Sequence, residues 1–143
     1  MQIKEFTRDL FTTSTDNYLV HCISSDFVMG AGIAIQFRAQ GVKKYLKTNY
    51  TSEWNNKGYA LYAPVGNYKG VYNLITKQYY YQKPTYQTIR DALSDMKVQI
   101  PNNARISMPH IGCGLDRLQW EEVKKIIIDT FRDTDCIISI CKL

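Results

Sequence analysis

The chain has 143 residues, of which 45% are hydrophobic and 22% are charged. This is the composition of an ordinary globular domain, so it excludes a disordered chain, and the length suits one domain over residues 1–143. The 18 basic and 13 acidic residues leave a net charge of +5, which favours an anionic partner without naming it.

The cysteines and the first residues predict the compartment. The four cysteines form no CxxC pair, so we expect reduced thiols in a cytoplasmic protein, or a nuclear one in a eukaryote. The chain starts without the apolar core of a signal peptide, and no apolar run approaches the roughly 20 residues that cross a membrane. We expect a soluble monomer without membrane contact.

With only His21 and His110 available, we expect neither a metal site nor a cofactor.

The first predicted strands lie before the first glycine-rich turn. Residues 1–6 are a weak strand candidate, and residues 12–17 are mostly turn formers. Residues 18–23 form a continuous apolar run between polar residues, which is typical of a strand buried on both faces.

Two short helices are predicted next. Ile33 and Phe37 lie one helical turn apart, which indicates a helix that Gly41 interrupts. The apolar residues within 42–49 indicate a second short helix.

The middle of the chain predicts two strands and a longer helix. Residues 59–63 and 71–76 are apolar runs separated by proline and glycine, and Lys77 follows the second run. Thr85 is expected to cap a helix whose apolar stripe extends to Ile100.

The last third repeats this alternation. Residues 104–108 and 135–141 predict strands, and residues 120–131 carry a helical apolar face. Strands that alternate with helices are typical of an α/β sheet covered on both faces.

Two glycine-rich turns, Gly30–Gly32 and Gly112–Gly114, each follow a predicted strand and precede a helix. Such turns expose backbone amides that bind anions, and a pair of them suits a diphosphate better than a single phosphate. Neither continues as GxGxxG, and no Walker lysine is present. Asp116 ends the second turn, and because a carboxylate repels phosphate, it indicates chemistry as well as binding.

Single residues keep a simpler interpretation at this point. Lys77 alone is an ordinary solvated lysine, and Asp116 alone is a turn residue near a helix start. Asp9, followed by threonines, suits a local cap. His21 lies inside a buried strand, where a core histidine with satisfied hydrogen bonds is the simpler interpretation.

Two further patterns also leave alternatives open. Cys113 near His110 suggests a thiol hydrolase, although no third residue that would orient the pair is apparent. Tyr79–Tyr81, flanked by Lys77, Lys83 and Arg90, suits either the stacking of single-stranded bases or an edge strand with tyrosines.

Five segments occur together in one order: HCIS at 21–24, MGAGIA at 29–34, LITK at 74–77, KPTY at 83–86 and MPHIGCGLDRLQW at 108–120. This set resembles the macrodomain family, in particular the branch typified by terminal ADP-ribose protein glycohydrolase. The resemblance extends from Asp9 to Leu143. It implies a three-layer α/β/α sandwich with a mixed central sheet and ADP-ribose lying across the strand ends.

The resemblance also implies a set of ligand contacts. Asp9 accepts from the adenine amino group with help from the Leu10 backbone, and the second glycine turn wraps the diphosphate and the proximal ribose. The full set is Asp9, Leu10, His21, Ser24, Met29, Gly30, Ala31, Gly32, Ile33, Thr76, Pro109, His110, Ile111, Gly112, Cys113, Gly114, Leu115 and Leu143. Arg8 stands where the family usually has glycine, and His110 stands where better-known members have arginine.

The catalytic pair implied by the resemblance is Lys77 and Asp116. The lysine attacks the anomeric carbon of the proximal ribose to give a lysyl–ADP-ribose intermediate, and the acid assists its resolution. The expected activity is removal of mono-ADP-ribose from acidic side chains of proteins, with nucleic acid as an alternative carrier. A phosphatase acting on ADP-ribose 1″-phosphate and a non-catalytic reader of ADP-ribose are the competing functions. The nucleophile must be a partly neutral amine, which burial favours and a neighbouring carboxylate opposes.

Overall fold

Six strands form one mixed sheet in the computed structural model, which describes all 143 residues. The strands are β1 (Gln2–Thr7), β2 (Tyr18–Ser24), β3 (Tyr59–Ala63), β4 (Gly70–Lys77), β5 (Arg105–Met108) and β6 (Ile137–Lys142). Their order across the sheet is β1-β6-β5-β2-β4-β3. Neighbouring strands run parallel except β3, which is antiparallel to β4.

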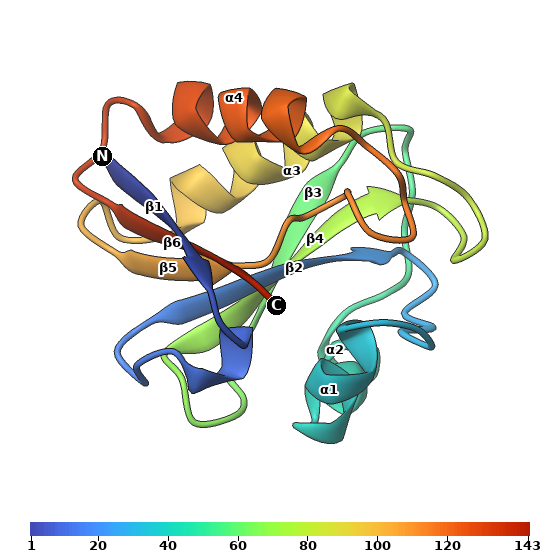
Figure 1. The fold of residues 1–143 in the computed structure, drawn as a ribbon. Coiled ribbons are helices and arrows are strands. Elements are labelled where there is room, and N and C mark those ends of the chain that lie inside the picture. Colours follow the sequence, from blue (N-terminus) through green and yellow to red (C-terminus); the bar gives the residue numbers. More distant parts are fainter.

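Helices cover both faces of this sheet, as Figure 1 shows. The helices are η1 (Leu10–Thr12, a 3-10 turn), α1 (Ala34–Ala39), α2 (Val42–Asn49), α3 (Tyr86–Gln99) and α4 (Trp120–Phe131). Helices α3 and α4 lie on one face, and α1 and α2 lie on the other (Figure 1). The predicted three-layer α/β/α sandwich with a mixed sheet is confirmed.

The two faces carry separate hydrophobic clusters. Val20, Leu74 and Ile106 belong to the cluster beneath α3 and α4, whereas Leu19 and Ile75 belong to the cluster beneath α1 and α2. Successive residues of one strand therefore enter different clusters, as the alternation of side chains along a strand requires. Strands β2 and β4 are buried on both faces, which explains why their sequences are continuously apolar.

Most predicted elements match the observed ones to within two residues. The predicted strand at 59–63 and the helix at 42–49 have the observed bounds. Thr85 caps α3 as expected, because its hydroxyl accepts from the Thr88 amide at 3.0 Å. The sequence did not predict η1, which begins before the turn expected at 12–17. No helix combines the length and the apolar character needed to cross a membrane.

Side chains of α3 satisfy the open edge of β3. Asp95 accepts from the Ala60 amide at 2.8 Å, and Asp91 accepts from the Gly58 amide at 3.2 Å. The amide group of Gln99 donates to the Ala60 carbonyl at 3.1 Å. These contacts occupy backbone groups that another strand would otherwise pair with.

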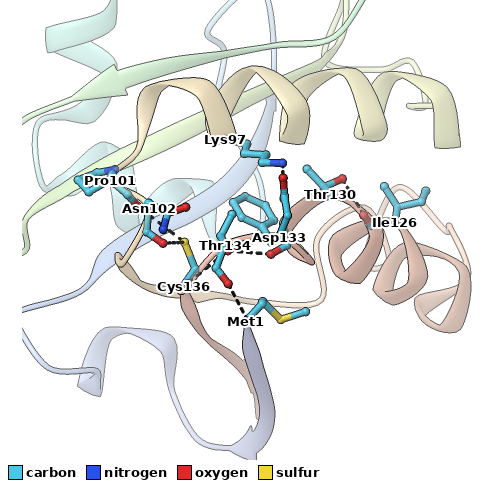
Figure 2. Close-up of polar contacts among 10 residues, drawn as sticks. Met1, Lys97, Pro101, Asn102, Ile126, Thr130, Asp133, Thr134 and Cys136 are labelled. Carbon is cyan, nitrogen blue, oxygen red and sulfur yellow. Dashed lines mark hydrogen bonds and ion pairs between the residues drawn. The ribbon is translucent and has the colours of Figure 1, made fainter.

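The end of the sheet where β1 and β6 begin is fastened by polar contacts, shown in Figure 2. The Met1 amino group donates to the Thr134 carbonyl at 2.7 Å, and the Cys136 thiol donates to the Asn102 carbonyl at 3.4 Å. Lys97 of α3 forms an ion pair with Asp133 at 2.5 Å. The connections after β2, β4 and β5 lie at the other end, where the strands finish (Figure 1).

Replacement of Gly58 by alanine is expected to destabilise the fold. A Cβ at this position would lie 2.0 Å from the Thr88 carbonyl oxygen, which belongs to the rigid backbone of α3. We expect a loss of about 1–3 kcal/mol in the free energy of unfolding, measured by urea denaturation. Gly114→Ala is the matched control, because a Cβ there meets nothing within 4 Å. Equal urea midpoints for the two variants would contradict the close approach of α3 to β3.

Candidate functional site

Lys77 ends β4 beside the end of β2. The two strands run parallel, and Lys77 is the register partner of Ser24, the last residue of β2. The Lys77 carbonyl accepts from the Ser25 amide at 2.9 Å, which continues the pairing past the strand end. Ligands of α/β sheets bind outside such carboxyl ends.

Asp116 contacts Lys77 directly. Its Oδ1 lies 2.7 Å from Lys77 Nζ, and the two side chains are only 17% and 13% exposed. The structure therefore brings together the two residues that were predicted to act as a pair across 39 positions of sequence. The partly enclosed contact lies at the strand ends, where a ligand has access.

The loop between β5 and α4 leaves several backbone amides without an acceptor in the protein. Gly112 adopts φ 72°, a left-handed conformation that favours glycine, and its carbonyl accepts from the Leu118 amide at 2.8 Å. This bond closes the loop back on itself. The amides without an acceptor within the protein are those of His110, Gly112, Gly114, Leu115 and Asp116.

The turn before α1 has the same property. Consecutive backbone amides from Met29 to Ala34 donate to no acceptor within the protein. Gly30 and Gly32 are exposed, and Gly32 adopts φ 59°. An uninterrupted run of free amides is the arrangement that binds phosphate oxygens.

The two glycine turns lie next to each other. A Cβ built on Gly32 would come within 4.0 Å of the Leu115 Cδ1 atom, and Leu115 is 74% exposed. Two sets of free amides therefore border one region of the surface. This proximity fits a diphosphate, whose two phosphates need donors from both sides.

Asp26 connects the loops around the site, a role that the sequence did not predict. Its Oδ1 accepts from the Ser24 hydroxyl and from the Val28 amide at 3.1 Å, and its Oδ2 accepts from the Tyr80 amide at 2.9 Å. One carboxylate thus links the end of β2, the first glycine turn and the segment after Lys77. The only local signal is the contact with the amide two residues on, which is an Asx turn.

Asp9 caps η1, as its local interpretation suggested. Its Oδ1 accepts from the Phe11 amide at 3.0 Å, and its second oxygen has no partner within the protein. The unexpected Arg8 donates to the Thr12 carbonyl at 2.8 Å. The Leu10 side chain is buried, so only its backbone can reach a ligand.

The side chain of His21 lies in the core, and the predicted ligand contact of this residue stays a prediction. The ring is fully buried, stacks on Phe37 at 3.9 Å and lies 2.6 Å from Asn73 Oδ1. Burial lowers the pKa of His21 from 6.5 to about 4, despite the hydrogen bond to Asn73, which opposes the shift. The ring is neutral and forms a polar pair inside the cluster beneath α1.

Ser24 and Thr76, two further predicted ligand contacts, are also buried. The Thr76 side chain is 1% exposed, and its hydroxyl has no hydrogen-bond partner, so it does not reach the surface. Ser24 is 3% exposed and donates to Asp26, so it acts on the first glycine turn through that carboxylate. Among the other predicted contacts, the side chains of Met29 and Ile111 are buried, which leaves their backbones as contact groups.

The His110 ring, at the position where better-known family members have arginine, makes its contacts within the protein. Its ring stacks on Trp120 at 4.0 Å with nearly parallel planes, and its Nε2 lies 3.6 Å from Glu5 Oε1. Burial and the charge of Lys142 lower the pKa of His110. The ring fastens the loop to α4 and β1, while its backbone amide remains free for a ligand.

Cys113 has the wrong environment for a thiol nucleophile. Its Sγ donates to the Ile111 carbonyl at 3.3 Å, and the thiol makes no hydrogen bond to His110. Burial and the nearby charge of Asp116 raise the pKa of Cys113 to about 11. The thiolate, which is the reactive form, is therefore disfavoured. The last predicted contact, Leu143, is 86% exposed beyond β6 and is open to a ligand.

Comparison with known proteins places the chain in a family, although no family model matches it. The ADP-ribose glycohydrolase OARD1 of Bos taurus is 43% identical over 139 residues, which cover 94% of this chain and 88% of that protein. The Homo sapiens protein of the same name is 41% identical over the same lengths.

Solved structures agree on the fold. The macrodomain of Mycobacterium tuberculosis DarG has 25% identity and a TM-score of 0.71, and the match covers 96% of this chain and 97% of that one. This chain is a macrodomain. A structure of Thermosipho africanus DarTG in complex with ADP-ribose matches with a TM-score of 0.70 at 18% identity, covering 99% of this chain and 42% of that one.

A hollow of about 690 Å³ in this macrodomain lies apart from these residues, between α3 and residues 53–59. None of the predicted site residues lines it. Two of its three carboxylates, Asp91 and Asp95, already accept from the Gly58 and Ala60 amides at the start of β3, so they maintain the strand edge. No cluster of three or more histidine, cysteine or acidic side chains with the arrangement of a metal site is present.

The burial of His21 predicts a pH dependence of the macrodomain's stability. The unfolded chain takes up a proton near pH 6.5, whereas the folded ring resists protonation until about pH 4. The free energy of unfolding therefore falls as the pH drops through this window, by about 2 kcal/mol between pH 7 and pH 5. Urea denaturation at both pH values measures this difference.

His21→Leu tests whether His21 causes this slope of the free energy of unfolding against pH. The variant should be less stable at every pH because Asn73 loses its partner. The contribution of His21 to the slope between pH 7 and pH 5 should be absent. His110→Gln is the matched control and should keep most of that slope. An unchanged slope in His21→Leu would contradict the neutral buried ring.

Proposed function

We propose that this macrodomain binds ADP-ribose and hydrolyses the bond that joins mono-ADP-ribose to an acidic side chain. The observation that carries the proposal is the 2.7 Å contact between Lys77 and Asp116 at the edge of two turns with free amides. A protein that only binds ADP-ribose has no need of a lysine and an acid in direct contact at this position. The curated relatives named as ADP-ribose glycohydrolases support an enzymatic function.

The ligand orientation follows from the donors around the site. The diphosphate lies between the Gly30–Gly32 and Gly112–Gly114 turns, where their free amides neutralise its charge. Asp9 holds the adenine amino group with the carboxylate oxygen that η1 leaves free. The proximal ribose then lies on the other side of the diphosphate, next to Lys77.

The first chemical step uses the contact between Lys77 and Asp116 as a proton path. The ion pair itself favours the protonated lysine, so a proton must pass from Nζ to Oδ1 before the attack. The neutral amine that this transfer leaves attacks the anomeric carbon of the proximal ribose with its lone pair. A bond forms between Nζ and this carbon, and the bond to the substrate oxygen breaks. The carboxylate of the modified side chain leaves with the bonding electrons.

The second step regenerates the lysine. Asp116 first passes the proton that it took from Nζ to the departing carboxylate. Water then attacks the anomeric carbon, the Asp116 carboxylate accepts a proton from that water, and this proton passes on to Nζ. The bond between the carbon and Nζ breaks, which releases ADP-ribose and restores the ion pair. No step is assigned to a metal ion, so we expect EDTA to leave the rate unchanged.

Lys77→Ala is expected to remove the hydrolytic activity and leave binding intact. Loss of the nucleophile should lower the rate of ADP-ribose release from a glutamate-modified protein by on the order of 10⁴-fold or more. Calorimetry should show ADP-ribose binding close to that of the wild type. Lys97→Ala is the matched control, because it removes a lysine from the ion pair with Asp133 outside the proposed site (Figure 2).

Full release by Lys77→Ala would exclude the covalent mechanism. If wild-type protein binds ADP-ribose but releases none from the modified protein, the proposed hydrolase is wrong and the protein is a reader. Release of inorganic phosphate from ADP-ribose 1″-phosphate would instead identify a phosphatase.

Asp116→Asn is expected to slow release by about 10²–10⁴-fold while Lys77 remains available. The variant keeps the side-chain size and loses the proton acceptor. If the acid mainly resolves the intermediate, a Lys77 adduct should accumulate in this variant, and mass spectrometry of the Lys77 peptide after reduction detects it. Wild-type rates in Asp116→Asn would show that the carboxylate has no part in either step.

A further inference from the structure

One surface of α1 and α2 carries positive charge alone. Its charged residues, here called the basic surface, line one hollow of about 420 Å³ together with Thr48, and they are Arg38, Lys43, Lys44 and Lys47. None of the four forms an ion pair with an acidic side chain. The chain has no acidic residue between Asp26 and Glu53, so these helices supply no counter-charge of their own.

The lysines of α2 oppose the stability of the helix itself. Lys43 and Lys44 stand in its first turn, where the helix dipole favours acids, and no acid is present there. In α4 the same chain places Glu121 and Glu122 in the first turn, as the dipole favours. Lys43 and Lys47 are four positions apart, so their like charges lie on one side of α2. Helix formation therefore does not explain this arrangement, whereas a partner of opposite charge does.

Lys43 shows that the positive charges are close enough to repel one another. Its partial burial and the charges of Arg38 and Lys47 lower the pKa of Lys43, although Asp26 opposes the shift. The Lys43 ammonium group donates to the Val28 carbonyl at 3.0 Å, which holds it in place. An anionic group bound at the basic surface would relieve the repulsion.

The basic surface lies within reach of a short peptide at Lys77. The Lys77 carbonyl accepts from the Ser25 amide, and Lys43 contacts Val28, three positions after Ser25. Three residues span at most about 11 Å, and an extended peptide of six residues covers about 20 Å. The run of free amides begins at Met29, directly after Val28, so the basic surface also borders the first glycine turn.

The chemistry of the basic surface favours the carboxylates of a peptide. No aromatic side chain lines the hollow, so it offers no platform for stacked bases. No apolar side chain lines it either, so nothing there inserts into a lipid surface. Its ammonium and guanidinium groups instead pair with several separate carboxylates, which is how clusters of cations recognise acidic motifs.

We propose that the basic surface binds acidic residues that flank the modified side chain in a protein substrate. The inference rests on the proposed function, which places the modified side chain at Lys77, and it adds the class of protein sequence that is preferred. Attraction between exposed charges of this kind lowers KM and is weakened by salt, while the bond-breaking step at Lys77 is the same for any flanking sequence.

Fluorescence anisotropy at low salt with a labelled, unmodified glutamate-rich peptide of about 12 residues tests binding without hydrolysis. The variant Lys44→Glu/Lys47→Glu should raise the Kd about tenfold or more, because repulsion replaces attraction. The matched control Lys69→Glu/Lys125→Glu makes the same change in net charge at exposed residues outside α1 and α2, and it should bind like the wild type. Lys77→Ala should also bind the peptide.

Release of ADP-ribose from two modified peptides tests the link to catalysis. Each carries one ADP-ribosylated glutamate, flanked by glutamates in the first peptide and by glutamines in the second. The wild type should have a kcat/KM about tenfold higher for the first peptide, through KM, and Lys44→Glu/Lys47→Glu should lose this preference. This variant should bind free ADP-ribose within about threefold of the wild type, because exposed charges are screened.

Equal kcat/KM values of the wild type for the two peptides would overturn the proposal, as would an equal loss of peptide binding in the variant and its control. Binding of a single-stranded oligonucleotide or of anionic vesicles in place of the peptide, dependent on Lys44 and Lys47, would also overturn it. If the wild type releases ADP-ribose from neither peptide but binds the glutamate-rich peptide through the basic surface, the proposed hydrolase fails and the acidic partner stands.

Discussion

The contact between Lys77 and Asp116 constrains the whole end of the sheet where the strands finish. Because β2 lies between β5 and β4, the loop after β5 must cross the end of β2 to bring Asp116 to Lys77. Two strand spacings amount to about 10 Å, which a tight turn does not span. The loop crosses this distance with Gly112 in a left-handed conformation, packed against Leu118 and Ile89. The path of this loop across the end of β2 therefore positions both its free amides and Asp116.

The polar residues near this end divide into a structural group and a group open to ligands. His21 and Asn73 hydrogen-bond to each other inside the cluster beneath α1, and Asn73 also donates to the Leu61 carbonyl at 3.1 Å. A buried polar group is tolerated when it has a partner, as His21 Nε2 has, although His21 Nδ1 has none. The pair joins β2, β4 and β3 inside the sheet. Lys77 and Asp116 keep partial exposure, which a reacting group requires.

Asp26 gives the site its rigidity at a point where the backbone leaves regular structure. A loop of free amides binds an anion well only if its donors are already oriented, since ordering them on binding costs conformational entropy. The Asp26 carboxylate accepts from Ser24, Val28 and Tyr80 and so orients the first glycine turn and the segment after Lys77 together. On the other side, the stack of His110 on Trp120 holds the second turn against α4.

The sequence by itself determined the order and type of the main elements, because the spacing of apolar residues is a local pattern. Apolar residues recur at every third or fourth position in a helix and at alternate positions in a half-buried strand. It also predicted both glycine turns and the Thr85 cap, whereas the pair Lys77 and Asp116 was implied only by the resemblance to the macrodomain family. Only the tertiary structure decided the strand order, the ion pair, the connecting role of Asp26, the burial of His21 and Thr76 and the exposure of Tyr79–Tyr81 outside any strand. These features depend on which distant segments become neighbours, and a polar residue in a strand has the same local pattern whether it faces a core partner or a ligand.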